Sequence, residues 1–177
     1  MTTVHAGLSS RAEALRHDFD HAFAAPPRMP SAADEDLLSI RVAGQPYAIR
    51  LSEIAGLFTD KRITPVPSRA PALLGIACFR GTILPVYGLH LLLGHPAAPP
   101  RWLVTAAAVS VAIAFEGFEG HLRLARDAIL HQEGDGPARR LLPERALTPH
   151  GIRPIVHLPA ILEAIGTHTQ DAAARER

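Results

Sequence analysis

Apolar and polar residues alternate along residues 37–51, which is the pattern of β-strands that bury one face. The apolar face consists of Leu38, Ile40 and Val42 and, after a turn at residues 43–46, of Tyr47, Ile49 and Leu51. Ser39 and Arg41 point to the opposite side of the first strand. A period of two residues on both sides of a Gly-containing turn predicts a β-hairpin whose one face packs on a core.

A second apolar stretch, residues 73–94, predicts two more strands. They are separated by Arg80 and Gly81, and the glycine supplies the positive φ of a tight turn. Residues 89–93 then suit one short helical turn, which Gly94 closes. This stretch therefore predicts a second hairpin with Arg80 at its tip.

Four prolines mark places where sheet pairing is interrupted. Pro65 and Pro67 predict an irregular edge segment. Pro85 and Pro154 stand inside strand-like runs, and neither can donate a ladder hydrogen bond. Each of these two prolines therefore predicts a strand edge or a bulge.

The apolar pattern recurs along the chain. Ile83, Pro85, Val86, Leu89, Leu92 and Leu93 return as Ile152, Pro154, Ile155, Leu158, Ile161 and Leu162, at an offset of 69 residues between Ile83 and Ile152. Residues 47–51 are echoed by residues 111–115. Two similar β units are the simplest explanation, and chance recurrence among apolar residues is the alternative. Units of about 60 residues with short strands suit small barrels, and their small size predicts that they share an apolar seam.

The two ends of the chain differ from this strand-rich centre. Ser10 and Glu13 fit a capping box, and apolar residues at helical spacing predict a helix over residues 10–25. This helix either packs on the barrels or serves as a detachable docking helix. His17 and His21 have the spacing of a metal-binding pair, but no third ligand is evident, which favours two solvated histidines. We expect a helix and linker at residues 1–36, a β-rich domain at 37–166 with units at 37–95 and 101–166, and a polar tail at 167–177.

Composition narrows the class of protein. The chain has 177 residues, of which 47% are hydrophobic and 20% charged, as in globular proteins. Its net charge of +1 gives no overall attraction to nucleic acid or anionic lipid. The single Cys78 excludes an internal disulfide, and its apolar surroundings predict that it is buried. No signal peptide or uninterrupted apolar stretch of about 20 residues is evident, so we expect a cytoplasmic protein.

No catalytic motif emerges from the ten histidines, which are scattered. The sequence has no H-E-x-x-H frame, no G-x-S-x-G elbow and no glycine-rich phosphate loop before a helix. Glu116 and Glu119 lie in the sequence FEGFEG, which reads as a solvated loop. His121 with Glu119 is the remaining catalytic alternative. These observations favour a binding module over an enzyme, with no metal and no cofactor. The charged Arg80 on an apolar hairpin is typical of an interface anchor, although a solvated turn residue is the simpler reading.

One family shares these features. Gly75, Arg80, Gly81, Pro85, Val86 and Leu89 stand at the positions of its central motif, and the hairpin at residues 37–51 and the Thr-Pro-Val-Pro sequence at residues 64–67 match as well. The chain resembles the CheW family of chemotaxis coupling proteins, most clearly over residues 37–93 and more weakly over residues 101–165.

This resemblance implies a mainly β fold of two SH3-like five-stranded barrels that share a hydrophobic core. It implies a non-catalytic adaptor in chemotaxis signal transduction, without a cofactor. Such adaptors bridge the cytoplasmic tip of methyl-accepting chemoreceptors to the regulatory domain of a CheA-type histidine kinase. Arg80 corresponds to the receptor-contacting arginine, Gly75 shapes the preceding strand, and Ile54 corresponds to an apolar receptor-groove residue.

The chain also departs from the family pattern. Cys78 replaces the motif asparagine, Gly88 replaces an acidic residue, and Gly56 stands where the family often has a glutamate able to pair with the arginine. In the second unit, residues 120–124 replace a Gly-apolar-apolar-Val-Asp stretch, and Asp127 is a candidate for the displaced acid. The alternative function is a regulatory module of the same fold that senses a small molecule in the seam between the barrels.

Overall fold

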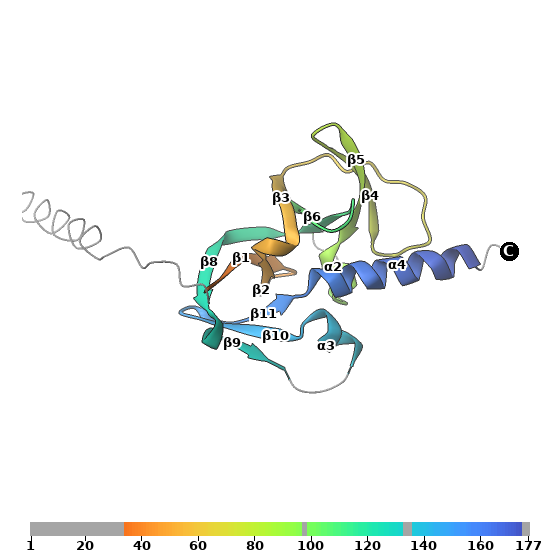
Figure 1. The fold of residues 1–177 in the computed structure, drawn as a ribbon. Coiled ribbons are helices and arrows are strands. Elements are labelled where there is room, and N and C mark those ends of the chain that lie inside the picture. Colours follow the sequence, from red (N-terminus) through yellow and green to blue (C-terminus); the bar gives the residue numbers. More distant parts are fainter. Residues whose placement is uncertain (1–33, 97–98, 133–135, 175–177) are drawn as a thin grey trace, which may run out of the picture. The chain divides into compact units, whose positions relative to one another are not determined.

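The computed structural model describes residues 34–96, 99–132 and 136–174 (Figure 1). The helix expected at residues 10–25, with His17 and His21, lies outside these residues. The described chain is mainly β, as expected, and its strands form two curled sheets. We describe this part of the chain by itself.

The first sheet has the strand order β8-β1-β2-β11-β10-β9. Its strands are β1 (Asp34–Val42), β2 (Gln45–Arg50), β8 (Gly117–Ala125), β9 (Ile129–His131), β10 (Glu144–Thr148) and β11 (Gly151–Val156). Its two edge strands, β8 and β9, follow one another in the chain through a short 3-10 turn, η2 (Arg126–Ala128). The sheet therefore curls until its two edges are connected.

The second sheet has the order β3-β6-β7-β5-β4. Its strands are β3 (Ile54–Thr59), β4 (Leu73–Phe79), β5 (Thr82–Gly88), β6 (Trp102–Ala106) and β7 (Ala112–Phe115). Its edges also approach one another, because Thr64, beyond the end of β3, exchanges backbone hydrogen bonds of 2.8 and 2.9 Å with Ile76 of β4. Residues 60–72 are otherwise irregular, as Pro65 and Pro67 predict.

The division between the two sheets corrects the expected units at residues 37–95 and 101–166. The chain leaves the first sheet at the 3-10 turn η1 (Leu51–Glu53), builds the whole second sheet from β3 to β7, and returns at Glu116. The strand that carries the repeated apolar pattern, β5 in the first repeat and β11 in the second, therefore pairs with a strand of the other repeat. The parallel pairs are Ile155 with Ala48 and Val156 with Ile49 in one sheet, and Val86 with Ala112 and Tyr87 with Ile113 in the other. A repeat of this size buries little surface alone, and the exchange gives each hairpin a neighbour.

The two repeated prolines lie where these parallel pairs begin. Pro85 pairs with Ile76 of β4, but pairing of β5 with β7 starts only at Val86. Pro154 pairs with Arg145 of β10, and pairing of β11 with β2 starts at Ile155. At each proline the strand has a neighbour on one side only, so the missing N–H costs no ladder hydrogen bond. The predicted edge character is confirmed locally, although both strands lie inside their sheets.

A common apolar core joins the two sheets, as the duplication predicts. The main cluster combines Leu38, Ile40, Val42, Tyr47 and Ile49 of the first sheet with Tyr87, Val104, Ile113 and Phe115 of the second. Leu158 and Ile161 of α4 (Leu158–Ala174) complete it, and both are at most 1% exposed. Burial of each large apolar side chain contributes about 1.5–3 kcal/mol to the free energy of unfolding.

Three details differ from the sequence predictions. Cys78 is exposed, because the alternation of β4 buries its neighbours Ala77 and Phe79 on the other face. The sequence FEGFEG is not a loop: residues 117–120 begin β8, which pairs with β1. The expected polar tail at residues 167–177 is helical as far as Ala174, within α4.

The remaining helices are short: α2 (Leu89–Leu92) and α3 (Pro137–Leu141). The former is the predicted helical turn, and Gly94 after it has a φ of +75°. Across the described ranges, no helix has both the length and the apolar composition needed to cross a bilayer.

The first residue of helix α4 is hydrogen-bonded to η1, where the chain passes from the first sheet to the second. The backbone N–H of Leu158, the first residue of α4, donates a 3.0 Å hydrogen bond to Glu53 Oε2 in η1. This bond satisfies an N-terminal donor that the helix itself cannot satisfy. Burial raises the pKa of Glu53 above its usual value, and the hydrogen bond from Leu158 and the nearby charge of His157 only partly offset this effect.

We expect Glu53→Gln to be at least as stable as the wild type at pH 8, and Glu53→Ala to lose about 1 kcal/mol. Glutamine keeps the oxygen that caps α4 and removes the buried charge. Because the folded-state pKa is raised, the stability linked to this carboxyl is full at low pH and is lost as pH rises through the folded-state pKa. Urea unfolding at pH 4 and pH 8 should therefore show Glu53→Gln gaining on the wild type as pH rises. A glutamine variant less stable than the wild type at pH 8 would contradict this account.

Candidate protein-interaction surface

Arg80 lies at the tip of the β4–β5 hairpin and is exposed. Arg80 and Gly81 have φ values of +48° and +86°, and positive values at both central residues are those of a type I′ turn. The predicted tight turn is therefore confirmed. The Arg80 guanidinium lies 5.9 Å from the centre of the Phe58 ring, and Lys61 Nζ lies 5.6 Å from the same ring. Phe58 in turn packs edge-on against buried Phe79, with 5.0 Å between ring centres.

Among the residues that the structure describes, no carboxylate forms an ion pair with Arg80. Its side chain instead contacts the ring of Phe58. Gly56 helps to explain this arrangement. A Cβ at position 56 would lie 2.9 Å from Cε2 of Phe58, so a larger residue would push the ring out of its place. The Arg80 side chain thus packs over the aromatic ring of Phe58. The guanidinium keeps its five N–H donors for a partner.

Gly75 is buried and has a backbone role. Its φ is +146°, and a Cβ there would lie 2.2 Å from the carbonyl oxygen of Thr64. Only glycine allows the segment after β3 to approach β4 this closely. Gly75 therefore positions the hairpin that carries Arg80.

Ile54 begins β3 and is half-buried against the main core cluster. Phe58, which supports Arg80, lies four residues later on the same strand. The structure therefore brings Arg80 to one end of β3 and leaves Ile54 at the other. Sequence analysis missed Phe58 and Lys61, because nothing in their local pattern marks them as neighbours of the hairpin tip.

Two exposed apolar pairs form a second feature that the sequence analysis missed. On β4–β5, exposed Cys78 pairs with Ile83, which is 66% exposed. On β10–β11, Leu147 pairs with Ile152, and they are 41% and 55% exposed. Ile83 and Ile152 occupy equivalent positions of the repeat. The repeat therefore presents one apolar pair on each of two sheets, and large exposed apolar side chains are common in interaction sites.

Most acidic groups of the first sheet are held in ion pairs. Glu119 contacts Arg41 and lies 2.7 Å from Arg153. Burial alone would raise the pKa of Glu119, but the hydrogen bonds from these arginines outweigh it and lower the pKa. The hydrogen bond from Arg123 lowers the pKa of Asp36, and His121 Nε2 lies 2.8 Å from Asp36 Oδ1.

His121 and Glu119 thus contact different partners and form no acid–base pair. A search of the described residues for three His, Cys, Asp or Glu side chains that could hold one metal ion finds no such group. The displaced-acid candidate Asp127 lies in η2 and is exposed.

Comparison with known proteins identifies the family. The profile of the CheW-like domain matches residues 36–164, which is most of the chain. The chain belongs to the CheW family. A search of curated proteins gives no match to the chain.

The CheW fold is also found in a solved structure, the scaffolding protein TtCheW from Thermoanaerobacter tengcongensis. The two share 16% sequence identity with a TM-score of 0.63, over 73% of this chain and 90% of that one. This similarity supports the fold. The profile match confirms the predicted family, whereas the roles of Arg80, Gly75 and Ile54 remain predictions.

We expect Gly75→Ala to destabilise this CheW domain by about 2–4 kcal/mol, because the new Cβ meets the Thr64 carbonyl in a left-handed backbone region. Gly166→Ala in α4 is the matched control: a Cβ there meets nothing within 4 Å, and alanine favours the helix. Denaturant unfolding of both variants measures the difference. Equal stabilities would show that the close approach at Gly75 is not a constraint.

Proposed function

We propose that this CheW-family protein is a non-catalytic adaptor that couples chemoreceptors to a CheA-type histidine kinase. The observation that carries the proposal is Arg80, an exposed cation without an acidic partner among the described residues, fixed on Phe58 at the tip of a rigid hairpin. A positioned arginine surrounded by apolar surface is typical of interface hot spots. Family membership supports the same role.

Arg80 and Ile54 form the proposed receptor face, with Gly75 as its positioning residue. The partner is the helical cytoplasmic tip of a methyl-accepting chemoreceptor. An amphipathic helix docks by placing apolar residues at intervals of three or four into an apolar groove. Ile54 and Arg80 stand at opposite ends of β3, so a helix along this strand would meet the apolar contact first and the charged contact at its other end.

The proposed kinase face is the second apolar pair, Leu147 and Ile152, on the other sheet. A regulatory domain with the same duplicated fold would present similar exposed hairpin pairs of its own. Two such surfaces on opposite repeats let one adaptor hold two partners at once. The proposal therefore assigns receptor and kinase to separate faces that can be disabled one at a time.

We expect Arg80→Glu to lower affinity for a receptor tip fragment from the same organism at least tenfold, because it reverses the charge that the hairpin turn itself presents. Retention of the purified adaptor on immobilised receptor fragment measures this loss. Arg139→Glu is the control, since Arg139 is exposed on α3, and it should bind as the wild type does. Undiminished binding by Arg80→Glu would remove Arg80 from the receptor face.

We expect Ile152→Asp to lower affinity for the regulatory domain of the kinase at least tenfold and to leave receptor binding unchanged. A charge on an exposed apolar contact costs desolvation that no partner repays. Because Ile152 is 55% exposed, the substitution should leave the fold intact, and the unfolding midpoint checks this. Calorimetric titration with each partner separates the two faces. Parallel loss of both partners would show that the faces are not independent.

The alternative function, a small-molecule-sensing module, draws support from a separate observation. A large cavity lies beside α4, away from Arg80. A ligand there is compatible with the adaptor role, because the two surfaces share no residue.

A further inference from the structure

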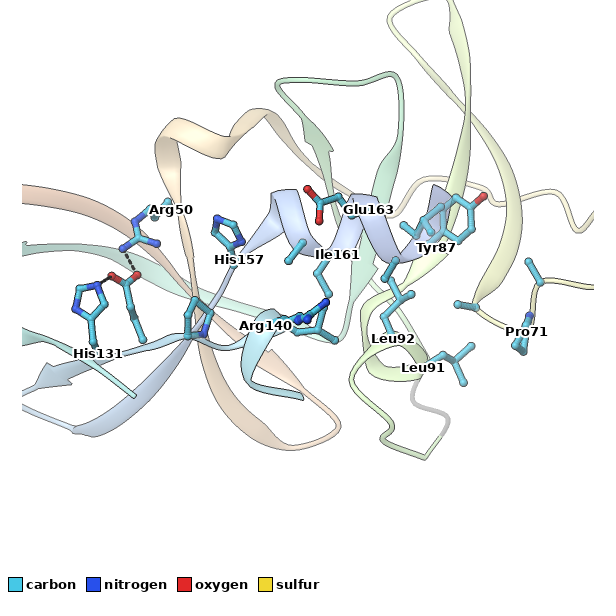
Figure 2. A pocket seen from close by; sticks show the side chains of 18 residues that line it. Arg50, Pro71, Tyr87, Leu91, Leu92, His131, Arg140, His157, Ile161 and Glu163 are labelled. Atoms are coloured by element: carbon cyan, nitrogen blue, oxygen red, sulfur yellow. Dashed lines mark hydrogen bonds and ion pairs between the residues drawn. The ribbon is translucent and has the colours of Figure 1, made fainter. Parts of the chain in front are cut away.

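A cavity of about 1150 Å³ lies along α4 (Figure 2). Its other walls are α2, α3 and the segment that precedes β4. This volume slightly exceeds the usual range of about 300–1,000 Å³ for small-molecule sites. None of the residues that line it belongs to the proposed receptor or kinase face.

The floor of the cavity is apolar and well packed. Ile161 and Ile165 of α4 and Tyr87 of β5 line it, and they are 0%, 7% and 9% exposed. Leu91, Leu92 and Leu141 add apolar walls. The cavity is therefore a preformed apolar surface on a rigid core, which suits the body of an apolar ligand.

The charges around the cavity are unequally compensated. At one end Arg50 pairs with Glu144, and His131 Nε2 lies 3.0 Å from Glu144 Oε1, as Figure 2 shows. Arg50 also donates to Glu35 at 2.9 Å, so this end is an internally satisfied network. Burial alone would lower the pKa of Arg50, but the hydrogen bonds that Arg50 donates to Glu144 and Glu35 outweigh burial and raise the pKa.

Arg140 of α3 is different. Its side chain lines the cavity together with Ile161 (Figure 2), and it forms no ion pair with any residue of the described ranges. The Glu163 carboxylate points away from it in the same view. The cavity thus combines an extended apolar floor with one cation that no described carboxylate neutralises.

We propose that this cavity binds a small amphipathic acid, whose apolar body contacts the half-buried Leu91, Leu92 and Leu141 above the buried floor and whose anionic group meets Arg140. An anion gains a charge-assisted hydrogen bond from a guanidinium, and because Arg140 is exposed this contribution is modest beside that of the apolar walls. The ligand is a free small molecule with one negative charge. The proposal is independent of the adaptor role, because the adaptor faces lie elsewhere.

The test uses the full chain and two probes, the aromatic sulfonate 1-anilinonaphthalene-8-sulfonate and monomeric decanoate. We expect the sulfonate to become fluorescent on binding and decanoate to displace it. Decanol, which has the same chain without the charge, should displace it about three- to fivefold less effectively, the effect of one partly solvated ion pair. Absence of binding by both probes would overturn the proposal, and equal displacement by decanol and decanoate would overturn the role of the charge.

Two pairs of variants locate the site. Arg140→Gln should weaken decanoate binding about three- to fivefold, whereas Arg139→Gln, the adjacent exposed arginine outside the cavity, should not. Ala160→Trp, at a cavity-lining position of α4, should abolish binding of both probes by filling the space. Ala138→Trp, exposed on α3 outside the lining, should bind both. Far-UV circular dichroism confirms folding of the tryptophan variants.

An equal effect of Arg139→Gln and Arg140→Gln would show a general charge effect and overturn the assignment. Unchanged binding by folded Ala160→Trp would place the probes elsewhere and overturn it as well. Receptor and kinase retention by Arg140→Gln should equal that of the wild type. Failure of the ligand site is therefore distinguishable from failure of the adaptor proposal.

Discussion

The parallel pairings of β11 with β2 and of β5 with β7 connect the two repeats, and the other features of the molecule depend on them. Each pairing joins the last strand of one repeat to the first hairpin of the other. Neither sheet is therefore built from one repeat alone, and the cluster of side chains between the sheets is a single core. Parallel strands need long connections. Here the whole second sheet, residues 54–115, lies between the halves of the first. This arrangement makes separate folding of residues 37–95 physically implausible, since β2 would lack β11.

Rigidity at the hairpin tip follows from this core. Phe79 is buried in the second sheet, Phe58 packs on Phe79, and Arg80 lies over Phe58. An arginine held in this way loses less conformational entropy on binding than one that moves freely in water. Gly75 contributes from within, because it lets the segment at Thr64 close the sheet beside the hairpin. The buried Gly75 therefore helps to set the position of the exposed Arg80.

The sequence predicted the hairpins, the Arg80 turn, the shared core and the family, because alternation and turn chemistry are local signals. It did not predict which strands share a sheet, since alternation identifies the buried face of a strand and not its neighbour. The residue type of Cys78 predicts burial, but its position in the alternation of β4 makes it exposed. The low β-propensity of glycine and glutamate around Glu119 predicts a loop, but pairing with β1 outweighs that preference and forms a strand. Phe58 and the cavity beside α4 depend on distant segments, and no local pattern reports them.

Gly56 shows how this chain departs from its family without losing the position of the arginine. A glutamate at position 56 would offer Arg80 a charge partner, but it would also place atoms where the Phe58 ring now lies. The aromatic ring supports the guanidinium through its π face and leaves the hydrogen-bond donors uncommitted. If Arg80 formed an ion pair within the chain, a partner's carboxylate would have to compete with that internal carboxylate. Binding would then lose the free energy of the internal pair. A cation resting on a ring keeps its full charge for the partner's carboxylate. Under the proposed adaptor role, glycine at position 56 would therefore favour receptor partners that supply the acid themselves.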